Sequence, residues 1–543
     1  MSPLGQRNYI ALFIFMGMIC FIGLFIPLMD NDAAHHANIA LHMYLSGDYV
    51  NLIDNGKDYL DKPHLHFWLA AISYQVFGVN EFAYKFPSFL LGIGGLFSLY
   101  KLGRLLFDAE TGRLSALIMA TAFSFFLSQA DVRMDAILVA AICFSCWQLL
   151  ELVINKQWIY VLGAALGMAI GFSVKGTIGV LVPAIFLFWY LAEKKQWGSL
   201  LSLRIPALLI LFFLFISPVL YCYYLQFDLH PEKIIRGKDH ITGVKFALFG
   251  GGIERFSGEM SQDGKKDWLF FLYTFLWAFA PWSIITYLAL VRKIKLKKDW
   301  FISATIISLA LMIGISGSKL PHYLNISFPF AALLTANYLH ERPLTKPIRI
   351  LLYSLMGIFL ASNYILNGWL FPEKIYRLAV FTFLIMNGSF LSSKTAADLK
   401  PFSYLLRSVL FLYLFMALGF YPKLLTYQAG QELAEKIDPE TNRESIYFWK
   451  DNYSSSFCFA TRTLRKEWTD TSMTGRGPYY LVYDISYEKQ ILEAGLVLGE
   501  KLKARDFEIT KLDKAFLDPK TREAHCSQLV MAKIDSVRKL PGN

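Results

Sequence analysis

The sequence predicts an all-α membrane protein with about 13 transmembrane helices, followed by a small C-terminal α/β domain. Of its 543 residues, 55% are hydrophobic and only 17% are charged, whereas a soluble protein carries about 25% charged residues. Aromatic residues make up 16% of the chain, as expected where aromatic belts mark the two membrane interfaces. This composition excludes a soluble enzyme, a disordered chain and a fibrous protein.

Thirteen apolar segments approach the length of about 20 residues that a membrane-spanning helix requires. The first segment follows Arg7 and has no small-residue cleavage site after it, so it is expected to be an uncleaved anchor. Lys175 and Gly176 separate two adjoining segments, because a lysine at the centre of a bilayer is costly. The predicted spans are 8–28, 84–107, 112–130, 133–154, 158–174, 177–193, 203–224, 268–292, 299–316, 322–340, 347–370, 376–392 and 403–421.

Lysine and arginine concentrate in every second connection between the predicted spans, most clearly in residues 292–298. The alternate connections include loop 29–83, which is acidic, and loop 225–267. Basic connections face the cytoplasm. The N-terminus is therefore predicted to be cytoplasmic, and both loops are predicted to be periplasmic in a bacterial inner membrane. Topology accounts for much of the net charge of +11, so nucleic-acid binding is not expected.

Residues 1–424 are thus predicted to form the transmembrane domain, and residues 425–543 a soluble periplasmic α/β domain. Cys458 and Cys526 are the two cysteines of the second domain. A disulfide between them and two free thiols are equally compatible with the sequence. Short apolar runs predict strands at Ser445–Trp449, Tyr479–Asp484, Phe507–Leu512 and Gln528–Ile534, with a helix at 486–497.

Ionisable residues from separate connections fall at the external ends of the predicted spans. Burying charge near lipid is expensive, so such residues indicate function. A transporter would place some of them near the midplane, whereas a layout at one edge favours an enzyme whose substrate sits in the outer leaflet. Ordinary alternatives stay open: a helix-end charge cluster around Arg133, and a lysine at 319 that extends to the interface. The residues are Asp32, Asp61, Lys62, Asp131, Arg133, Asp135, Lys175, Lys319 and His322.

The first external loop has the pattern of two interfacial helices, at 32–45 and 63–80, separated by turn residues. A carboxylate at Asp32 can activate a hydroxyl group. Ammonium groups at Lys62, Lys175 and Lys319 can hold a phosphate or diphosphate. One carboxylate with several cations fits sugar transfer from a phosphate-linked donor. Five histidines of this loop (His35, His36, His42, His64 and His66) leave metal binding open as an alternative.

Residues 8–340 resemble the bacterial transferases that move 4-amino-4-deoxy-L-arabinose from undecaprenyl phosphate to lipid A. Those enzymes belong, with the protein O-mannosyltransferases, to the GT-C superfamily of polytopic glycosyltransferases. Ala33 follows Asp32 where the family usually has Glu, and Gly252 stands where the arabinose transferases have a histidine. The resemblance rests on Asp32, Ser46-Gly47-Asp48-Tyr49, Asp61-Lys62-Pro63, Phe77–Phe82, Arg133-Met134-Asp135, Lys175-Gly176, Arg255-Phe256, Pro281-Trp282 and Gly317–Tyr323.

The resemblance implies a GT-C fold and an inverting sugar transfer from a polyprenyl-phosphate donor to lipid A or another envelope acceptor. It implies a catalytic role for Asp32 and a divalent metal ion (zinc, magnesium or manganese) at Asp61. The residues implied in binding the donor phosphate are Lys62, Lys175, Lys319 and Arg255, and those implied in binding substrate are Asp135, Tyr59, His322 and Tyr323.

Three other functions stay open from the sequence. Protein O-glycosylation shares the fold and the donor chemistry. A lipid or polysaccharide transporter would show charges deep in its spans and two similar halves, and the sequence shows neither. A structural membrane protein would not need the one-sided set of ionisable residues. We expect a monomer whose partners are the lipid-linked donor, the acceptor (lipid, glycan or protein) and membrane lipids.

Overall fold

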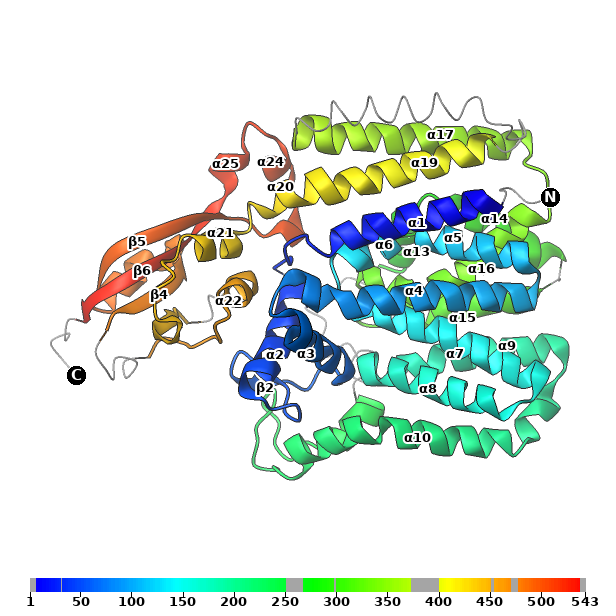
Figure 1. The fold of residues 1–543 in the computed structure, drawn as a ribbon, viewed down its shortest axis with the longest axis horizontal. Coiled ribbons are helices and arrows are strands. Elements are labelled where there is room, and N and C mark those ends of the chain that lie inside the picture. Colours follow the sequence, from blue (N-terminus) through cyan, green and yellow to red (C-terminus); the bar gives the residue numbers. More distant parts are fainter. Residues whose placement is uncertain are drawn as a thin grey trace.

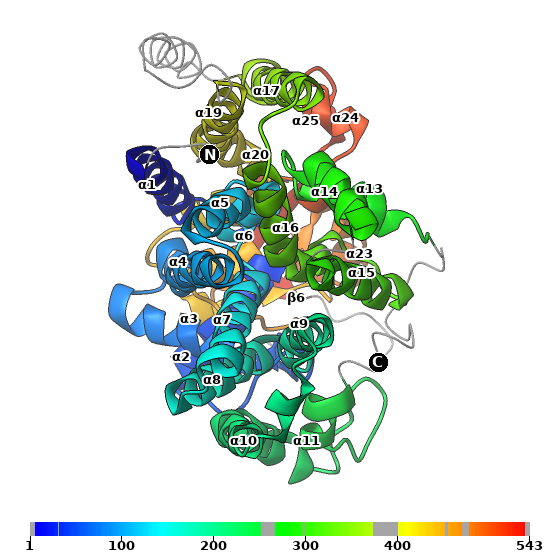
Figure 2. The same cartoon turned by 90° about the vertical axis from the view of Figure 1, so that its right-hand side faces the viewer.

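Long apolar helices run side by side through most of the chain, and a four-stranded sheet lies beyond one end of this bundle (Figure 1). The computed structural model describes residues 6–30, 32–250, 267–296, 299–372, 400–450, 454–469 and 477–537. Seen along the helices, α17 and α19 lie at one edge of the bundle and α10 at the opposite edge (Figure 2).

The first half of the bundle contains the two interfacial helices and a short hairpin of β1 (Ile53–Asp54) and β2 (Lys57–Asp58). Its helices are α1 (Gln6–Gly23), α2 (Asp32–Ser46), α3 (Leu65–Phe77), α4 (Glu81–Leu106), α5 (Ala109–Ala120), α6 (Phe123–Ala130), α7 (Asp135–Asn155), α8 (Trp158–Lys175), α9 (Ile178–Lys194), α10 (Arg204–Tyr223) and α11 (Gly243–Lys245).

The second half contains α13 (Phe270–Ala278), α14 (Ser283–Leu296), α15 (Trp300–Ile315), the 3-10 segment η4 (Pro321–Ser327), α16 (Phe328–His340), α17 (Lys346–Tyr364), α19 (Lys400–Phe415) and α20 (Tyr421–Leu425). The predicted interfacial helices 32–45 and 63–80 are thus present as α2 and α3. The predicted spans 112–130 and 268–292 are each broken into two helices.

Six helices of the described ranges are long and apolar enough to cross a membrane, or seven if α5 and α6 form one span that bends by 58°. The chain is therefore a multi-pass membrane protein. Helix α7 lies at the centre of the bundle, and 78% of its most apolar stretch is buried. The corresponding share for α10, at the edge, is 28%. The predicted span 376–392 lies outside the described residues, and the total of about 13 spans stays a prediction.

Successive helices alternate in direction, so the start of α7 and the end of α8 meet at the same end of the bundle. Gly171 and Gly179 allow the close crossing of α8 and α9 beside the Lys175-Gly176 turn: a Cβ at Gly179 would lie 2.2 Å from the Gly171 carbonyl carbon. Helices α2 and α3 cover this end, next to the sheet, and the N-terminus lies at the other end (Figure 1).

The sheet has the order β3-β4-β6-β5, with β3 parallel to β4 and the other neighbours antiparallel. Side chains alternate between its two faces. Val482 and Met531 pack against α21 and α22, whereas Leu481 and Val530 pack against α23. The elements are α21 (Ala429–Glu435), β3 (Ile446–Phe448), α22 (Ser455–Thr461), β4 (Tyr479–Asp484), α23 (Glu488–Glu493), β5 (Leu496–Asp506), α24 (Lys514–Leu517), α25 (Arg522–His525) and β6 (Ser527–Val537).

The predicted strands near 445–449, at 479–484 and near 528–534 are present. The strand predicted at 507–512 is wrong, because residues 509–511 form a 3-10 turn and the strand is β5, at 496–506. The predicted helix 486–497 is shorter in the structure, where α23 ends at Glu493, because β5 already begins at Leu496. Charged residues occupy much of β5, which hides its apolar pattern, and its pairing with β6 determines its position. The boundary between residues 424 and 425 stays a prediction.

Cys458 and Cys526 are both free thiols. Cys458 is buried on α22, and the Sγ of Cys526 donates a hydrogen bond to the Arg522 carbonyl at 3.2 Å. The disulfide that the sequence left open is therefore not formed.

We predict that Asp506→Asn stabilises the protein at neutral pH. Burial raises the pKa of the Asp506 carboxyl to about 6, and the nearby carboxylates of Asp30 and Asp484 also raise it. The folded state therefore holds a proton that the unfolded state loses near pH 4, so stability falls as pH rises from about 4 to above 6. The amide removes the buried charge and keeps an acceptor for the Ala429 N–H. Thermal unfolding in detergent should show a gain of about 2 kcal/mol at pH 7.5 and a flatter pH profile. A variant less stable than wild type at pH 7.5 would contradict this.

Candidate active site

A buried ion pair joins the start of α7 to the end of α8. The Lys175 Nζ lies 2.8 Å from an Asp135 carboxylate oxygen, and the side chains are 8% and 5% exposed. Asp135 is the first residue of α7 and Lys175 is the last of α8, so the alternating direction of the helices brings them together. The Lys175 Nζ also lies 5.8 Å from the centre of the Tyr323 ring. His322, whose ring meets that of Tyr323 edge-on, lies within electrostatic range of Asp135.

Asp32 lies at the edge of this cluster, where it forms an ion pair with Arg133 at 3.3 Å. Arg133 also pairs with Asp131 at 3.0 Å, and it interacts electrostatically with Asp135. Half of the Asp32 side chain is exposed. The carboxylate is therefore held by one cation while one side of it faces solvent. Arg133 was seen in the sequence only as a member of a charge cluster, and the structure makes it the link between Asp32 and the buried pair.

Asp61 forms an ion pair with Arg236, a residue of the second external loop that the sequence analysis did not single out. The same loop is attached to the hairpin by Lys233, whose Nζ lies 2.9 Å from Asp58. The run of charges at 232–240 was the available signal for these contacts.

A metal site at Asp61 stays a prediction. In the part of the chain that the structure describes, no three His, Cys, Asp or Glu side chains come together to hold a metal ion. The residue paired with Asp61 is a cation, which is not a metal ligand.

The histidines of the first external loop are mainly structural. The Nε2 of His64 bonds to the Val50 carbonyl at 2.8 Å, and that of His66 bonds to the Tyr84 hydroxyl at 3.1 Å. Burial lowers the pKa of each to about 4, so both rings are neutral at pH 7. Burial also lowers the pKa of His36, as do the neighbouring His66, His35 and Lys62. These rings fix the fold of the loop that carries Asp32.

Three other predicted site residues have contacts of their own, and a fourth lies outside the described residues. The Lys319 Nζ donates to the Asp267 carbonyl at 2.5 Å and lies 5.4 Å from the centre of a Trp268 ring. Lys62 lies within electrostatic range of His36. The Tyr59 ring packs edge-on against His35. Arg255 lies outside the described residues. Among the described residues, ion pairs and electrostatic interactions join Asp32, Arg133, Asp135, Lys175 and His322, and none of them includes Lys319.

The buried pair stands in the wall of an open cavity whose empty volume, with the open solvent at its mouth included, is about 940 Å³. Its polar lining comes from Asp61, Asp135, Lys175, Thr177, Tyr223, Ser316 and Tyr323. Apolar walls continue from this point between α7, α9, α15 and η4, and consist of Leu138, Ile178, Leu181, Met312, Ile313 and Ile326 among others. A cationic end with long apolar walls is suited to an amphiphile that has an anionic head group.

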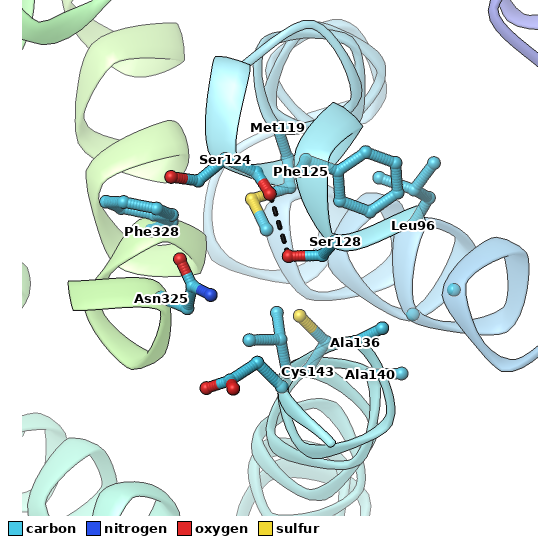
Figure 3. A pocket seen from close by; sticks show the side chains of 14 residues that line it. Leu96, Met119, Ser124, Phe125, Ser128, Ala136, Ala140, Cys143, Asn325 and Phe328 are labelled. Carbon is cyan, nitrogen blue, oxygen red and sulfur yellow. Dashed lines mark hydrogen bonds between the residues drawn. The ribbon is translucent and has the colours of Figure 1, made fainter. Parts of the chain in front are cut away.

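A second, smaller cavity has an empty volume of about 380 Å³, open solvent included, and is drawn in Figure 3. It is mainly apolar, with Leu96, Met119, Phe125 and Phe328 in its walls, and the Asn325 amide points into it (Figure 3). Asp135 lines both cavities. A change at Asp135 is thus expected to affect both.

Solved structures with this architecture show which fold it is. ArnT from Cupriavidus metallidurans bound to undecaprenyl phosphate superimposes with a TM-score of 0.73, covering 98% of this chain and 99% of that one at 16% identity. The same protein in the apo state gives a TM-score of 0.70. The chain has the fold of a GT-C glycosyltransferase. The GT-C fold accounts for a helical bundle with external loops and a smaller sheet region at one end.

Sequence relatives agree with the GT-C fold. Residues 61–222 match the family model described as dolichyl-phosphate-mannose-protein mannosyltransferase. The undecaprenyl phosphate-alpha-4-amino-4-deoxy-L-arabinose arabinosyl transferase of Pseudomonas aeruginosa is 27% identical over 335 residues, which are 59% of this chain and 56% of that protein. An uncharacterized protein of Aquifex aeolicus is 24% identical over 349 residues, 62% of this chain and 65% of its own length. These matches span between about half and two thirds of the relatives' lengths.

We predict that Lys175→Ala destabilises the protein strongly, because it leaves the Asp135 carboxylate buried without its cation. Breaking a buried pair by removing one partner costs about 3 to 5 kcal/mol. Lys489→Ala is the matched control, since Lys489 pairs with Glu493 at 3.8 Å on the surface, with side chains 87% and 64% exposed. An exposed pair contributes about 0.5 kcal/mol. Thermal unfolding in detergent measures both. Equal small losses for the two variants would show that the Asp135–Lys175 pair is not a stabilising element.

Proposed function

We propose that this protein is an integral membrane glycosyltransferase that transfers a sugar from a polyprenyl-phosphate donor to lipid A or another envelope acceptor, with inversion at the anomeric carbon. The large cavity carries the proposal. It combines a buried ammonium group with apolar walls, which fits a phosphate on a long hydrocarbon chain. The match to a structure of ArnT bound to undecaprenyl phosphate supports the same donor class.

Lys175 is the group that we propose to stabilise the leaving phosphate. An ammonium has three N–H donors, and Asp135 accepts one of them. The remaining donors can face the cavity that Lys175 lines. As the bond between the anomeric carbon and the phosphate oxygen breaks, negative charge develops on the phosphate. A fixed cation in a site of low dielectric constant stabilises that charge more than water does. Tyr223 and Tyr323 supply further hydrogen-bond donors in the same wall.

Asp32 is the proposed general base. Its half-exposed carboxylate can approach a hydroxyl that enters from the aqueous side. The acceptor oxygen attacks the anomeric carbon, its proton passes to Asp32, and polyprenyl phosphate departs. Arg133 donates a hydrogen bond to Asp32 and orients its carboxylate before the attack. If the acceptor is itself a phosphate, no strong base is required and Asp32 positions the substrates instead.

The cellular setting is part of the proposal. The basic connections favour a cytoplasmic N-terminus in a bacterium, so the cavity mouth, α2, α3 and the C-terminal sheet would face the periplasm. The fold would then contain about 13 spans, with a separate domain from residue 425 onward, and would act as a monomer. A lipid acceptor would enter from the outer leaflet of the inner membrane. Lys62, Lys319 and Arg255 remain proposed contacts for the donor phosphate, and Tyr59 and His322 for substrate.

A protein O-glycosyltransferase is the second candidate, and the match of residues 61–222 to a protein mannosyltransferase model favours it specifically. The donor chemistry would be the same and only the acceptor would differ. Purified enzyme with a polyprenyl-phosphate sugar and separate lipid A, glycan and peptide acceptors distinguishes the two. Sugar should appear on lipid A or glycan. Sugar on peptide alone would establish the second candidate, and donor movement across the bilayer without release of polyprenyl phosphate would indicate a transporter.

We predict that Asp32→Asn abolishes transfer without affecting folding. Removing a general base lowers the rate by roughly 100- to 10,000-fold, and a half-exposed side chain contributes little to stability. The measurement is release of polyprenyl phosphate from the donor, with a melting curve for each preparation.

Asp54→Asn is the matched control for Asp32→Asn. Asp54 also carries a carboxylate in the first external loop and pairs with His35 at 2.8 Å, but we give it no role in transfer. It should retain activity close to that of wild type. Near-complete activity in Asp32→Asn would exclude the base role for Asp32.

A further inference from the structure

Asp30 connects the loop that carries Asp32 to the C-terminal part of the chain. It lies between α1 and α2, two residues before Asp32. Its Oδ1 accepts the backbone N–H groups of Ser455 and Ser456 at 2.9 and 3.2 Å. Its Oδ2 accepts the hydroxyls of Ser454 and Ser456 at 2.5 and 3.0 Å. One carboxylate thus receives four hydrogen bonds from the first turn of α22, more than 420 positions away in the sequence.

The backbone around Asp30 is held by two further side chains. The buried Gln428 accepts the Asp30 N–H at 2.5 Å and donates to the Leu28 carbonyl at 2.8 Å. Lys85 of α4, which is fully buried, donates to the carbonyls of Gly23 and Ile26 at 3.2 and 2.6 Å. The linker between α1 and α2 is therefore fixed by α4 on one side and by the C-terminal part on the other. Its conformation determines where α2, and with it Asp32, begins.

Helix α22 also contacts α2 and α3 directly. The Asn38 side chain donates to the Ser455 carbonyl at 2.7 Å. Phe459 of α22 packs into the apolar cluster of α2 and α3, with its ring centroid 6.1 Å from that of Tyr74. This apolar contact does not depend on the Asp30 carboxylate. Loss of the carboxylate should therefore loosen the linker at Asp30 while α22 stays docked.

We propose that Asp30 is a positioning residue: its carboxylate fixes the linker to α22 and so holds Asp32 in the place from which it acts. The inference rests on the proposed function for its effect on the reaction. It also gives the C-terminal part of the chain a defined task in catalysis, because the four hydrogen-bond donors come from that part. A displacement of a catalytic group by about 1 Å can cost about 100-fold in rate, so a small shift of the linker is sufficient.

The test compares Asp30→Asn with Asp484→Asn. The first variant is isosteric, but its amide nitrogen meets groups that themselves donate. The control removes a more exposed carboxylate that likewise accepts hydrogen bonds from serines, because Asp484 accepts the N–H and hydroxyl of Ser486 and the hydroxyl of Ser527. Asp484 lies at the end of β4 and we assign it no part in the site. Asp30→Ala is the second Asp30 variant, and it is used if the asparagine amide finds new partners.

Donor turnover and hydrogen–deuterium exchange are measured on the same preparations of full-length protein. In Asp30→Asn we expect kcat to fall by roughly 10- to 100-fold, the KM for donor to stay unchanged, and amide exchange to rise in residues 28–46. Asp484→Asn should match wild type in all three. An unchanged kcat, or unchanged exchange at 28–46 in both Asp30 variants, would overturn the inference.

The two proposals fail in different ways. If wild type and Asp484→Asn release no polyprenyl phosphate from any donor, the proposed function fails, and exchange at 28–46 alone then decides whether Asp30 holds the linker. If wild type is active and the Asp30 variants lose affinity for donor as much as turnover, Asp30 is not a positioning residue for Asp32.

Discussion

The buried ion pair between Asp135 and Lys175 is the interaction on which the rest of the site depends. It joins the ends of α7 and α8 at 2.8 Å inside an apolar bundle, where either charge alone would be costly. Its position creates a cation in the wall of a large cavity while keeping that cation neutralised when no substrate is present. A phosphate can therefore bind the Lys175 N–H groups that Asp135 does not use. The buried ammonium then has an anionic partner both before and after the phosphate binds.

The rest of the site extends from this pair towards solvent. Arg133 links the pair to Asp32, the hairpin loop brings Asp61 to the cavity, and Arg236 of the second external loop holds Asp61 there. Contacts from the C-terminal part of the chain then fix the linker that precedes Asp32. The arrangement places an apolar wall, a buried cation and a half-exposed carboxylate in series. That order suits a reaction between a lipid-linked donor and an acceptor that arrives from outside.

The sequence predicted much of this arrangement, because hydropathy fixes the length and alternation of spans and charge fixes their ends. The Lys175-Gly176 turn, both interfacial helices and three strands of the sheet were found in this way. The sequence did not predict which connections contact each other. The alternating direction of the helices brings charged residues to one end of the bundle but does not determine which of them become neighbours. The contact of Lys319 with the Asp267 carbonyl was therefore not foreseen, and Arg236 was missed. Strand β5 was missed because its charged residues interrupt the apolar pattern.

A structure of the protein in a lipid nanodisc with polyprenyl phosphate bound tests the central claim most directly. The account predicts the phosphate within hydrogen-bonding distance of the Lys175 Nζ and the first prenyl units along Leu181 and Ile313. Density for the phosphate away from Lys175, or for the prenyl chain in the smaller cavity beside Ala140, would contradict it.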